Sequence, residues 1–224
     1  MPQHEAPDNL IAYYAARAAE YDEVYQKPER QNDISSLRST LRQLLSGHSV
    51  LEVACGTGFW TEEIAATASH IHATDVNDSV LKIASERLRR YRNVTIDRDD
   101  AFALTGASGV FTAAFAGFWW SHVRRGEQLS RFLNVLHAKL QPGALVVFMD
   151  NRYVEGSNLP ITREDADGNT YQKRRLRDGN EHEVLKNFPG EEEFRSLLQG
   201  RGNMLEFRWL KYYWCLSYRA EPGN

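Results

Sequence analysis

The amino-acid sequence predicts an α/β fold, in which helices cover both faces of a doubly wound, seven-stranded and mostly parallel sheet. Three observations carry this prediction. Short apolar segments alternate five times with helical segments, which is the pattern of parallel β-α units. The segment 144–149 is continuously apolar, as is typical of a strand buried on both faces. Two more strand-like segments, 204–211 and 212–219, leave room only for a tight turn, so we expect an antiparallel C-terminal pair.

Two helices are expected before the first strand. Residues 10–25 are rich in alanine and tyrosine, and alanine is the strongest helix former. The second helix ends at Gly47, and its apolar face contains Ile34, Leu37, Leu41, Leu44 and Leu45.

Five strands and the helices between them form the expected core. The strands are predicted at 49–54, 71–75, 94–98, 111–116 and 144–149. Helices are expected at 60–68, after a cap at Asn77 or Asp78, and along the apolar stripe of Leu129, Phe132, Leu133, Leu136 and Leu140.

The regular alternation stops after Asp150. Residues 151–188 are polar, and their Asp178-Gly179 pair between two strand-like stretches predicts a β-hairpin. We interpret this segment as an inserted flap after strand five, and a final helix is expected at 191–200. The expected organisation is a single domain with an N-terminal helical lid (1–33), a core (34–150), the substrate flap (151–188) and a C-terminal helix and strand pair (189–224).

Composition and charge exclude several classes of protein. Hydrophobic residues make up 42% of the chain, which excludes a disordered protein. The net charge of −3 gives no basic surplus for nucleic acid, and the basic runs at 87–92 and 173–175 are interpreted as solvated faces. Cys55 and Cys215 lie too far apart to predict a disulfide framework or a zinc site, so no metal is expected. With neither an apolar run long enough for a membrane span nor a secretory signal, we expect a cytoplasmic protein without a membrane partner.

A glycine turn after the first predicted strand is the most informative motif. The stretch from Glu52 to Gly58 places an acidic residue at the strand end and two spaced glycines before a helix. Glycines let a ligand approach the backbone closely, and ligands of open α/β sheets bind beyond the carboxyl ends of the strands. A dinucleotide fingerprint would need a third glycine where Thr61 stands, so a nicotinamide-dependent dehydrogenase is disfavoured.

Other strand ends supply complementary groups to the same crevice. Asp75 ends the second strand, where a carboxylate can accept hydrogen bonds from ribose hydroxyls. Asp100 and Ala101 follow the third strand, and Gly117 ends the fourth. Together the groups at these strand ends are suited to binding the adenosine part of a ligand.

This set of motifs resembles the class I S-adenosylmethionine-dependent methyltransferases, which have a Rossmann-like fold. The resemblance covers about residues 34–150, with Ala54 in place of the first glycine of the family's glycine motif. It implies S-adenosylmethionine as the cofactor, a small-molecule acceptor, and a tyrosine-rich lid that includes Tyr14. The residues it assigns to the cofactor are Tyr13, Tyr21, Glu52, Ala54, Gly56, Gly58, Asp75, Val76, Asp100, Ala101, Phe102 and Gly117.

The acceptor site is expected near the ends of strands four and five. His122 follows strand four and is the candidate general base, because an imidazole titrates near neutral pH. The substrate-binding candidates are the apolar Trp119 and Trp120, the Arg152-Tyr153 pair after strand five and His182 on the flap. The alternative for each is packing, capping or an exposed ion pair.

Several alternatives remain open at this stage. A nucleic-acid or protein methyltransferase would share the cofactor, and a non-catalytic methyltransferase-like module would keep the fold alone. The flap could also serve as a dimerisation arm, so a homodimer is possible. Neither the acceptor nor the methylated atom follows from the sequence.

Overall fold

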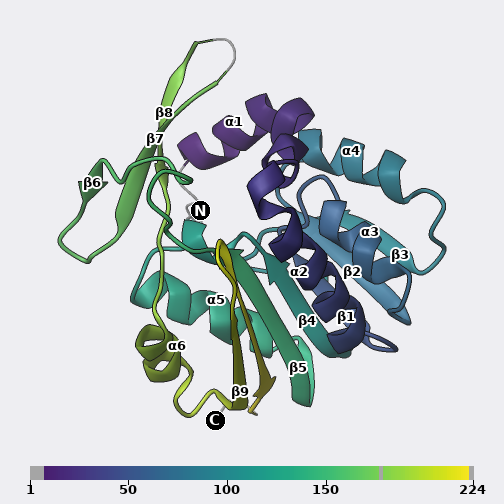
Figure 1. Ribbon diagram of the computed structural model, residues 1–224. Coiled ribbons are helices and arrows are strands. Elements are labelled where there is room, and N and C mark those ends of the chain that lie inside the picture. The colour runs from purple at the N-terminus through teal and green to yellow at the C-terminus, as the bar shows by residue number, and fades with distance from the viewer. Residues whose placement is uncertain (1–7, 177–178, 222–224) are drawn as a thin grey trace.

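The main sheet has seven strands in the order β3-β2-β1-β4-β5-β10-β9 (Figure 1). The computed structural model describes residues 8–176 and 179–221. All neighbouring pairs from β3 to β5 are parallel, and β10 is antiparallel to both β5 and β9. The predicted fold class is therefore confirmed, including the antiparallel pair at the C-terminal end.

The strands of this sheet alternate with five helices. The strands are β1 (Ser49–Val53), β2 (His70–Asp75), β3 (Val94–Arg98), β4 (Phe111–Gly117), β5 (Leu140–Asn151), β9 (Gly202–Trp209) and β10 (Tyr213–Ala220). The helices are α2 (Gln31–Leu44), α3 (Phe59–Ala65), α4 (Asp78–Leu88), α5 (Glu127–His137) and α6 (Glu191–Leu198).

Two apolar clusters lie on opposite faces of the sheet. Val50 and Leu51 are adjacent on β1 but belong to different clusters, because successive side chains of a strand point to opposite faces. One cluster includes Leu41 of α2 and Ile64 of α3, and the other includes Phe132 of α5. The sheet is thus buried on both faces, and its carboxyl edge is left for binding.

The N-terminal segment crosses this carboxyl edge beside α4 (Figure 1). A continuous helix was expected over 10–25, but α1 (Asp8–Arg17) is followed by the 3₁₀ helix η1 (Ala18–Tyr25). The short 3₁₀ helix η2 (Pro28–Arg30) then leads into α2. Tyr25, the last residue of η1, is buried against Phe59, with ring centroids 4.3 Å apart. Side-chain packing at the sheet edge thus accompanies the change from an α-helix to the more tightly wound 3₁₀ helix.

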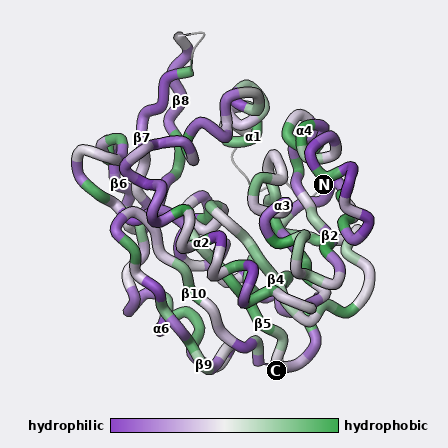
Figure 2. Tube along the Cα trace, turned by 45° about the vertical axis from the view of Figure 1, so that its right-hand side comes forward, coloured by the Kyte–Doolittle hydropathy of each residue, from purple (hydrophilic) through white to green (hydrophobic). Residues whose placement is uncertain are grey.

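The segment after β5 forms a second, smaller antiparallel sheet. Its strands are β6 (Arg163–Glu164), β7 (Thr170–Arg175) and β8 (Glu181–Leu185). The predicted hairpin is present as the β7-β8 pair, although Asp178 of its turn lies outside the described residues. The hairpin projects past the main sheet next to α1, and Figure 2 shows that it is mostly hydrophilic. Within the described ranges, no helix has both the length and the apolar character needed to cross a membrane.

Candidate active site

The turn from β1 to α3 has an unusual backbone. Ala54, Gly56 and Gly58 have φ angles of 56°, 56° and 74°, in the left-handed region that favours glycine. A Cβ atom on Gly58 would lie 2.9 Å from Leu88 Cδ1 and 3.3 Å from Ala84 Cα. Gly58 therefore allows α3 to start close against α4, and Ala54 holds its conformation at some steric cost.

Asp75 links the end of β2 to this turn. Its Oδ2 accepts a hydrogen bond from the Gly56 amide at 3.0 Å, and its Oδ1 accepts one from the Asn77 amide at 2.9 Å. Burial raises the pKa of Asp75, and the backbone donors oppose that shift. A carboxylate oxygen can accept more than one hydrogen bond, so Asp75 keeps accepting capacity toward a ligand.

The loop after β3 is organised by a buried aspartate, Asp99, which no sequence motif singled out. Asp99 accepts hydrogen bonds from the amides of Asp100, Thr105 and Gly106 at 2.9, 3.1 and 2.8 Å. Asp100 in turn accepts one from the Phe102 amide at 2.9 Å. The loop is thereby fixed with Asp100 and Ala101 at the edge of the sheet.

A cavity, here called the inner cavity, lies over the ends of β1 to β4. It brings together side chains that are far apart in sequence, and α1 forms its outer wall with Leu10 and Tyr14. The residues predicted to bind the cofactor that line it are Tyr21, Ala54, Gly56, Asp75, Val76, Asp100, Ala101 and Gly117.

Four predicted cofactor residues do not line the inner cavity: Tyr13, Glu52, Gly58 and Phe102. Gly58 is enclosed between α3 and α4. Phe102 is only 4% exposed and packs edge-on against Phe132 on α5, so it contributes to the core and does not line the inner cavity. The loop turns after Asp100, which directs the Phe102 ring into the cluster on that face.

Glu52 lies beside the inner cavity, in a small cavity that Gly56 and Gly117 also line. It is 2% exposed, and its Oε2 has no hydrogen-bond partner among the residues that the structure describes. Burial raises the pKa of Glu52 to about 8. A buried polar atom without a hydrogen-bond partner is unfavourable, so this carboxyl is suited to a polar group that a ligand brings.

A second cavity, here called the outer cavity, lies between the N-terminal segment and the flap. Its volume is about 480 Å³. The inner and outer cavities share four lining side chains: Tyr14, Tyr21, Phe118 and His122. Phe118 has a φ of 61°, so both β1 and β4 are followed by a left-handed residue other than glycine where the cavities meet.

His122 stands at this junction with both ring nitrogens engaged. Its Nδ1 lies 2.7 Å from the Leu185 carbonyl oxygen, which can only accept, so Nδ1 carries the proton. Its Nε2 is then an acceptor, and Tyr14 Oη donates to it at 2.7 Å. Burial, followed by the charges of Lys186 and Arg174, lowers the pKa of His122 well below its usual range. The ring is therefore neutral, and its Nε2 lone pair accepts from Tyr14 where the two cavities meet.

A buried ion pair joins the flap to the end of β5. Lys186 Nζ donates to Asp150 Oδ1 at 2.8 Å and to Ser121 Oγ at 2.5 Å. The Ser121 amide also donates to Asp150 Oδ2 at 3.0 Å. Burial acts to raise the pKa of Asp150, but the Lys186 ammonium outweighs it and holds the pKa below its ordinary value. Asp150 thus holds the Lys186 side chain in the wall of the outer cavity.

The two predicted acceptor tryptophans point in different directions. Trp119 lines the inner cavity rather than the outer one. Trp120 is 2% exposed and packs against Phe148, Phe194 and Trp214, so it belongs to the core. The 3₁₀ helix η3 (Trp120–His122) turns the chain between them, which sequence periodicity alone did not indicate.

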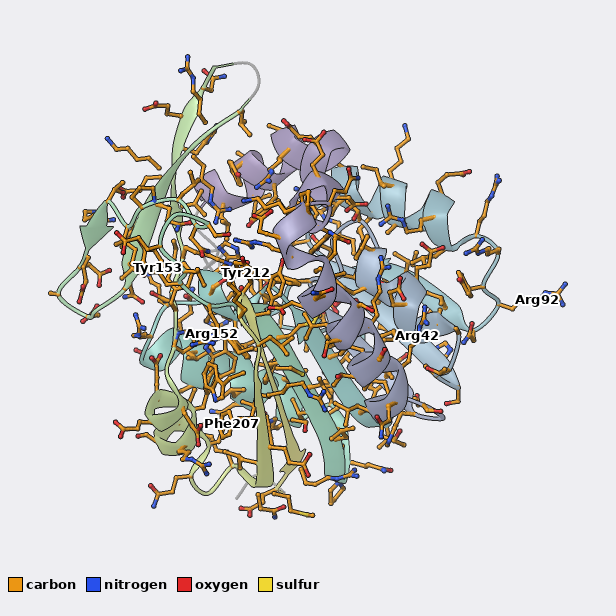
Figure 3. The ribbon with its side chains drawn as sticks, in the orientation of Figure 1. Arg42, Arg92, Arg152, Tyr153, Phe207 and Tyr212 are labelled. Atoms are coloured by element: carbon orange, nitrogen blue, oxygen red, sulfur yellow. The ribbon has the colours of Figure 1, made fainter. Side chains whose placement is uncertain are left out.

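The Arg152-Tyr153 pair also lies outside both cavities (Figure 3). The Arg152 amide donates to the Tyr212 carbonyl at 2.8 Å, so the chain after β5 stays beside the start of β10. The Arg152 guanidinium lies over the Trp209 ring at 5.6 Å, and Tyr153 is 42% exposed. Arg92, in the basic run that was interpreted as a solvated face, extends into solvent on the opposite side (Figure 3).

Tyr13 and His182 pack on each other where α1 meets β8. Their ring centroids are 5.4 Å apart, and Arg17 Nη1 donates to Tyr13 Oη at 2.8 Å. Tyr13 lines the outer cavity, not the inner one to which the sequence assigned it. His182 lies outside that lining and supports the Tyr13 ring from the flap.

The outer cavity also contains basic residues that sequence reasoning missed. Arg30 precedes α2 with no motif around it, and Arg174 belongs to the basic run that was interpreted as solvated. Both line the outer cavity, and Arg30 is 5% exposed. Alternation along β7 was the available signal, because Gln172 and Arg174 share one face of a strand.

Comparisons with known proteins agree with this geometry. Residues 50–143 match the family described as "Methyltransferase domain". Demethylmenaquinone methyltransferase of Staphylococcus aureus (strain JH9) is 24% identical over 173 residues, which are 70% of this chain and 68% of the relative. The same protein of strain Newman gives the same values.

Solved structures resemble the whole chain. "DhpI-SAH complex structure" has a TM-score of 0.78 at 23% identity and covers 99% of this chain and 100% of its own. "DhpI-SAM-HEP complex" has a TM-score of 0.77 at 22% identity, with 98% and 100% covered. An S-adenosylmethionine-dependent methyltransferase from Clostridium acetobutylicum has a TM-score of 0.65 at 16% identity, with 91% and 99% covered. Residues 50–143 thus match a methyltransferase domain, and the whole chain has the Rossmann-like fold of solved S-adenosylmethionine-dependent methyltransferases.

Proposed function

We propose that the chain transfers a methyl group from S-adenosylmethionine to a small molecule held in the outer cavity. One observation carries the proposal: the inner and outer cavities meet at the four side chains that line both. A donor in one cavity and an acceptor in the other would face each other there, as a direct displacement requires. The volume of about 480 Å³ lies within the range of small-molecule pockets. The Staphylococcus aureus relatives, named for demethylmenaquinone, support a small-molecule acceptor.

The residues of the inner cavity and its small neighbour fit the cofactor. Glu52 offers a buried oxygen without a partner, which suits the ammonium of the methionine part. Asp75 has accepting capacity for ribose hydroxyls, and Asp100 lies where it can accept from the adenine amino group. Val76, Ala101 and Gly117 would form the walls around these polar groups.

The chain's own contribution is placement and exclusion of water. When bound, the cofactor supplies an electrophilic methyl group on a sulfonium sulfur. The rings of Tyr14, Tyr21 and Phe118 line the junction, and aromatic faces attract a cation. Their packing over the sheet edge would also exclude water from the junction.

His122 is the group that can accept a proton from the acceptor. Its Nδ1 proton is held by the Leu185 carbonyl, so Nε2 is the accepting nitrogen and can take a proton through the Tyr14 hydroxyl that donates to it. The same burial that keeps the ring neutral also makes it a weak base. His122 therefore acts only where the acceptor must lose a proton as the new bond forms.

The experiment follows the label from S-[methyl-³H]adenosylmethionine. The full chain is incubated with a cell extract that has been divided by dialysis into a small-molecule fraction and a macromolecular fraction. The proposal expects labelled product in the small-molecule fraction, with less label when His122→Ala replaces the unsubstituted chain.

Two other outcomes would contradict the proposal. Label in nucleic acid or protein would favour the macromolecular methyltransferase instead. Absence of cofactor binding by calorimetry, in a chain that melts cooperatively, would favour a non-catalytic module.

A further inference from the structure

The wall of the outer cavity has a strong excess of positive charge. Its basic side chains outnumber its carboxylates by seven to two. The basic residues are Arg17, Lys27, Arg30, Lys173, Arg174, Arg175 and Lys186, and the acidic residues are Glu20 and Glu181. This excess contrasts with the whole chain, which has a net charge of −3. The charge is therefore concentrated at this cavity rather than spread over the molecule.

Arg30 lines the cavity and is buried, and no carboxylate among the described residues pairs with it. Its Nη1 donates to Asn151 Oδ1 at 3.2 Å, and its Nη2 donates to Ser157 Oγ at 2.8 Å. Within the described part of the chain, its Nε has no hydrogen-bond partner, and no carboxylate lies within 4.0 Å of the guanidinium. The guanidinium lies over the Tyr212 ring at 5.2 Å, which also holds its position.

Arg174 approaches the cavity from the flap in a similar state. Its Nη2 donates to Gln172 Oε1 at 3.2 Å, while its buried Nε has no hydrogen-bond partner among the described residues. Its guanidinium carbon lies 5.8 Å from the centroid of the Tyr13 ring. The charge of Arg174 also acts on Tyr14 and His122, so it lies close to the junction of the two cavities.

Lys186 shows that the charges converge on one space. Burial lowers the pKa of Lys186 to about 8, and the charges of Arg174 and Arg30 act in the same direction. Asp150 compensates Lys186, with which it makes a direct ion pair. Arg30 is buried and Arg174 is half-buried with a buried Nε, and no carboxylate of the described residues neutralises either charge.

A buried charge without a counterion is costly, whereas an arginine fork binds an oxyanion through two hydrogen bonds at once. We propose that the acceptor is a small anion, whose carboxylate or phosphoryl group binds between Arg30 and Arg174 in the outer cavity. This inference rests on the proposed function, because it names the chemical class of the molecule that receives the methyl group. A neutral acceptor would leave both guanidinium groups without a counterion.

The test is a calorimetric titration of the full chain, saturated with S-adenosylhomocysteine, in a chloride buffer. Inorganic phosphate tests the phosphoryl source, benzoate tests the carboxylate source, and benzamide is the neutral match of benzoate. We expect phosphate or benzoate to bind and benzamide not to bind. Arg174→Gln should lower the affinity for whichever anion binds by roughly 10- to 100-fold, the range expected for the loss of one charged hydrogen bond.

Matched variants make the result specific. Arg163→Gln removes a positive charge from the same small sheet, at a residue that pairs with Glu183 away from the cavity, and it should leave anion binding unchanged. Arg174→Lys should retain more binding than Arg174→Gln, since it keeps the charge. If Arg174→Gln does not fold, Arg30→Gln is titrated in its place, with the same weakening expected.

The inference is overturned if neither anion binds, if benzamide binds as well as benzoate, or if Arg174→Gln and Arg30→Gln bind the anion as well as the unsubstituted chain. A preceding titration with S-adenosylhomocysteine separates this failure from that of the proposed function. If S-adenosylhomocysteine binds and the anions do not, the anion inference alone is lost. If S-adenosylhomocysteine itself does not bind, the proposed function is lost with it.

Discussion

Glu52 should release a proton when the cofactor binds. Burial raises the pKa of this carboxyl to about 8 in the ligand-free protein, so at pH 7 it is about 90% protonated. The ammonium that we place beside Oε2 favours the ionised form, because an opposite charge lowers the pKa of a buried carboxyl. Binding at pH 7 should therefore release up to about one proton per cofactor from this carboxyl.

Calorimetry in two buffers of different ionisation enthalpy measures this release. The proton count is the slope of the observed binding enthalpy against the buffer enthalpy. In Glu52→Gln this release at pH 7 should be lost, and the cofactor should bind roughly 10- to 100-fold more weakly, as expected for one charged hydrogen bond. Equal proton release by Glu52→Gln and the unsubstituted chain would refute the reasoning.

Stability against pH gives an independent check on the same carboxyl. The folded pKa of Glu52 is raised from 4.5 to about 8, so the stability that its proton contributes is complete below pH 4.5. That contribution declines between pH 4.5 and about 8 and is lost as the pH rises through 8, because ionisation would leave a buried charge. The melting temperature of the ligand-free Glu52→Gln variant should fall less over this range than that of the unsubstituted chain.

Four further substitutions test other parts of the site. His122→Ala should lower kcat with little change in cofactor affinity, and full activity with an acceptor that must lose a proton would exclude a base role. Asp75→Ala should weaken cofactor binding about tenfold or more, because a charged acceptor for the ribose hydroxyls is lost. Calorimetry measures this affinity, and Asp75→Asn should have a milder effect. Gly58→Ala should destabilise the fold by about 1–3 kcal/mol, since its Cβ meets α4 at a positive φ; an unchanged urea midpoint would contradict that packing. Lys186→Met should destabilise it by about 3–5 kcal/mol because Asp150 loses its ion-pair partner, and adding Asp150→Asn should restore part of the loss.

The parts of this protein that follow from local patterns were predictable. The continuous apolar run predicts the buried strand β5, and the apolar stripe with helical spacing predicts α5. The sheet and its helices can be predicted from such patterns. The glycine turn and Asp75 were also predictable, because their backbone geometry needs particular residues. These features act over a few neighbouring residues, where sequence spacing translates directly into structure.

The acceptor side was less predictable, because tertiary packing decides it. Trp119 and Trp120 are adjacent residues of the same type, so the sequence does not distinguish them. The turn at η3 places Trp119 in the wall of the inner cavity and Trp120 in the core. The sequence indicated that Arg174 belongs to a solvated basic run. In the structure the flap places it in the lining of the outer cavity. Arg30 gained its place from contacts with Asn151 and Ser157, more than a hundred residues away in the chain.

The flap also acts on the chemistry of the core through one hydrogen bond. The carbonyl of Leu185, at the end of β8, holds the proton on His122 Nδ1 and leaves Nε2 as the acceptor toward Tyr14. Lys186, the next residue, is paired with Asp150 at the end of β5, so the position of that carbonyl is set by a buried ion pair. A change that loosens this pair would free the His122 ring to adopt either tautomer and so reduce the fraction that can accept a proton. The inserted segment therefore not only lines the outer cavity but also determines which nitrogen of His122 carries the proton.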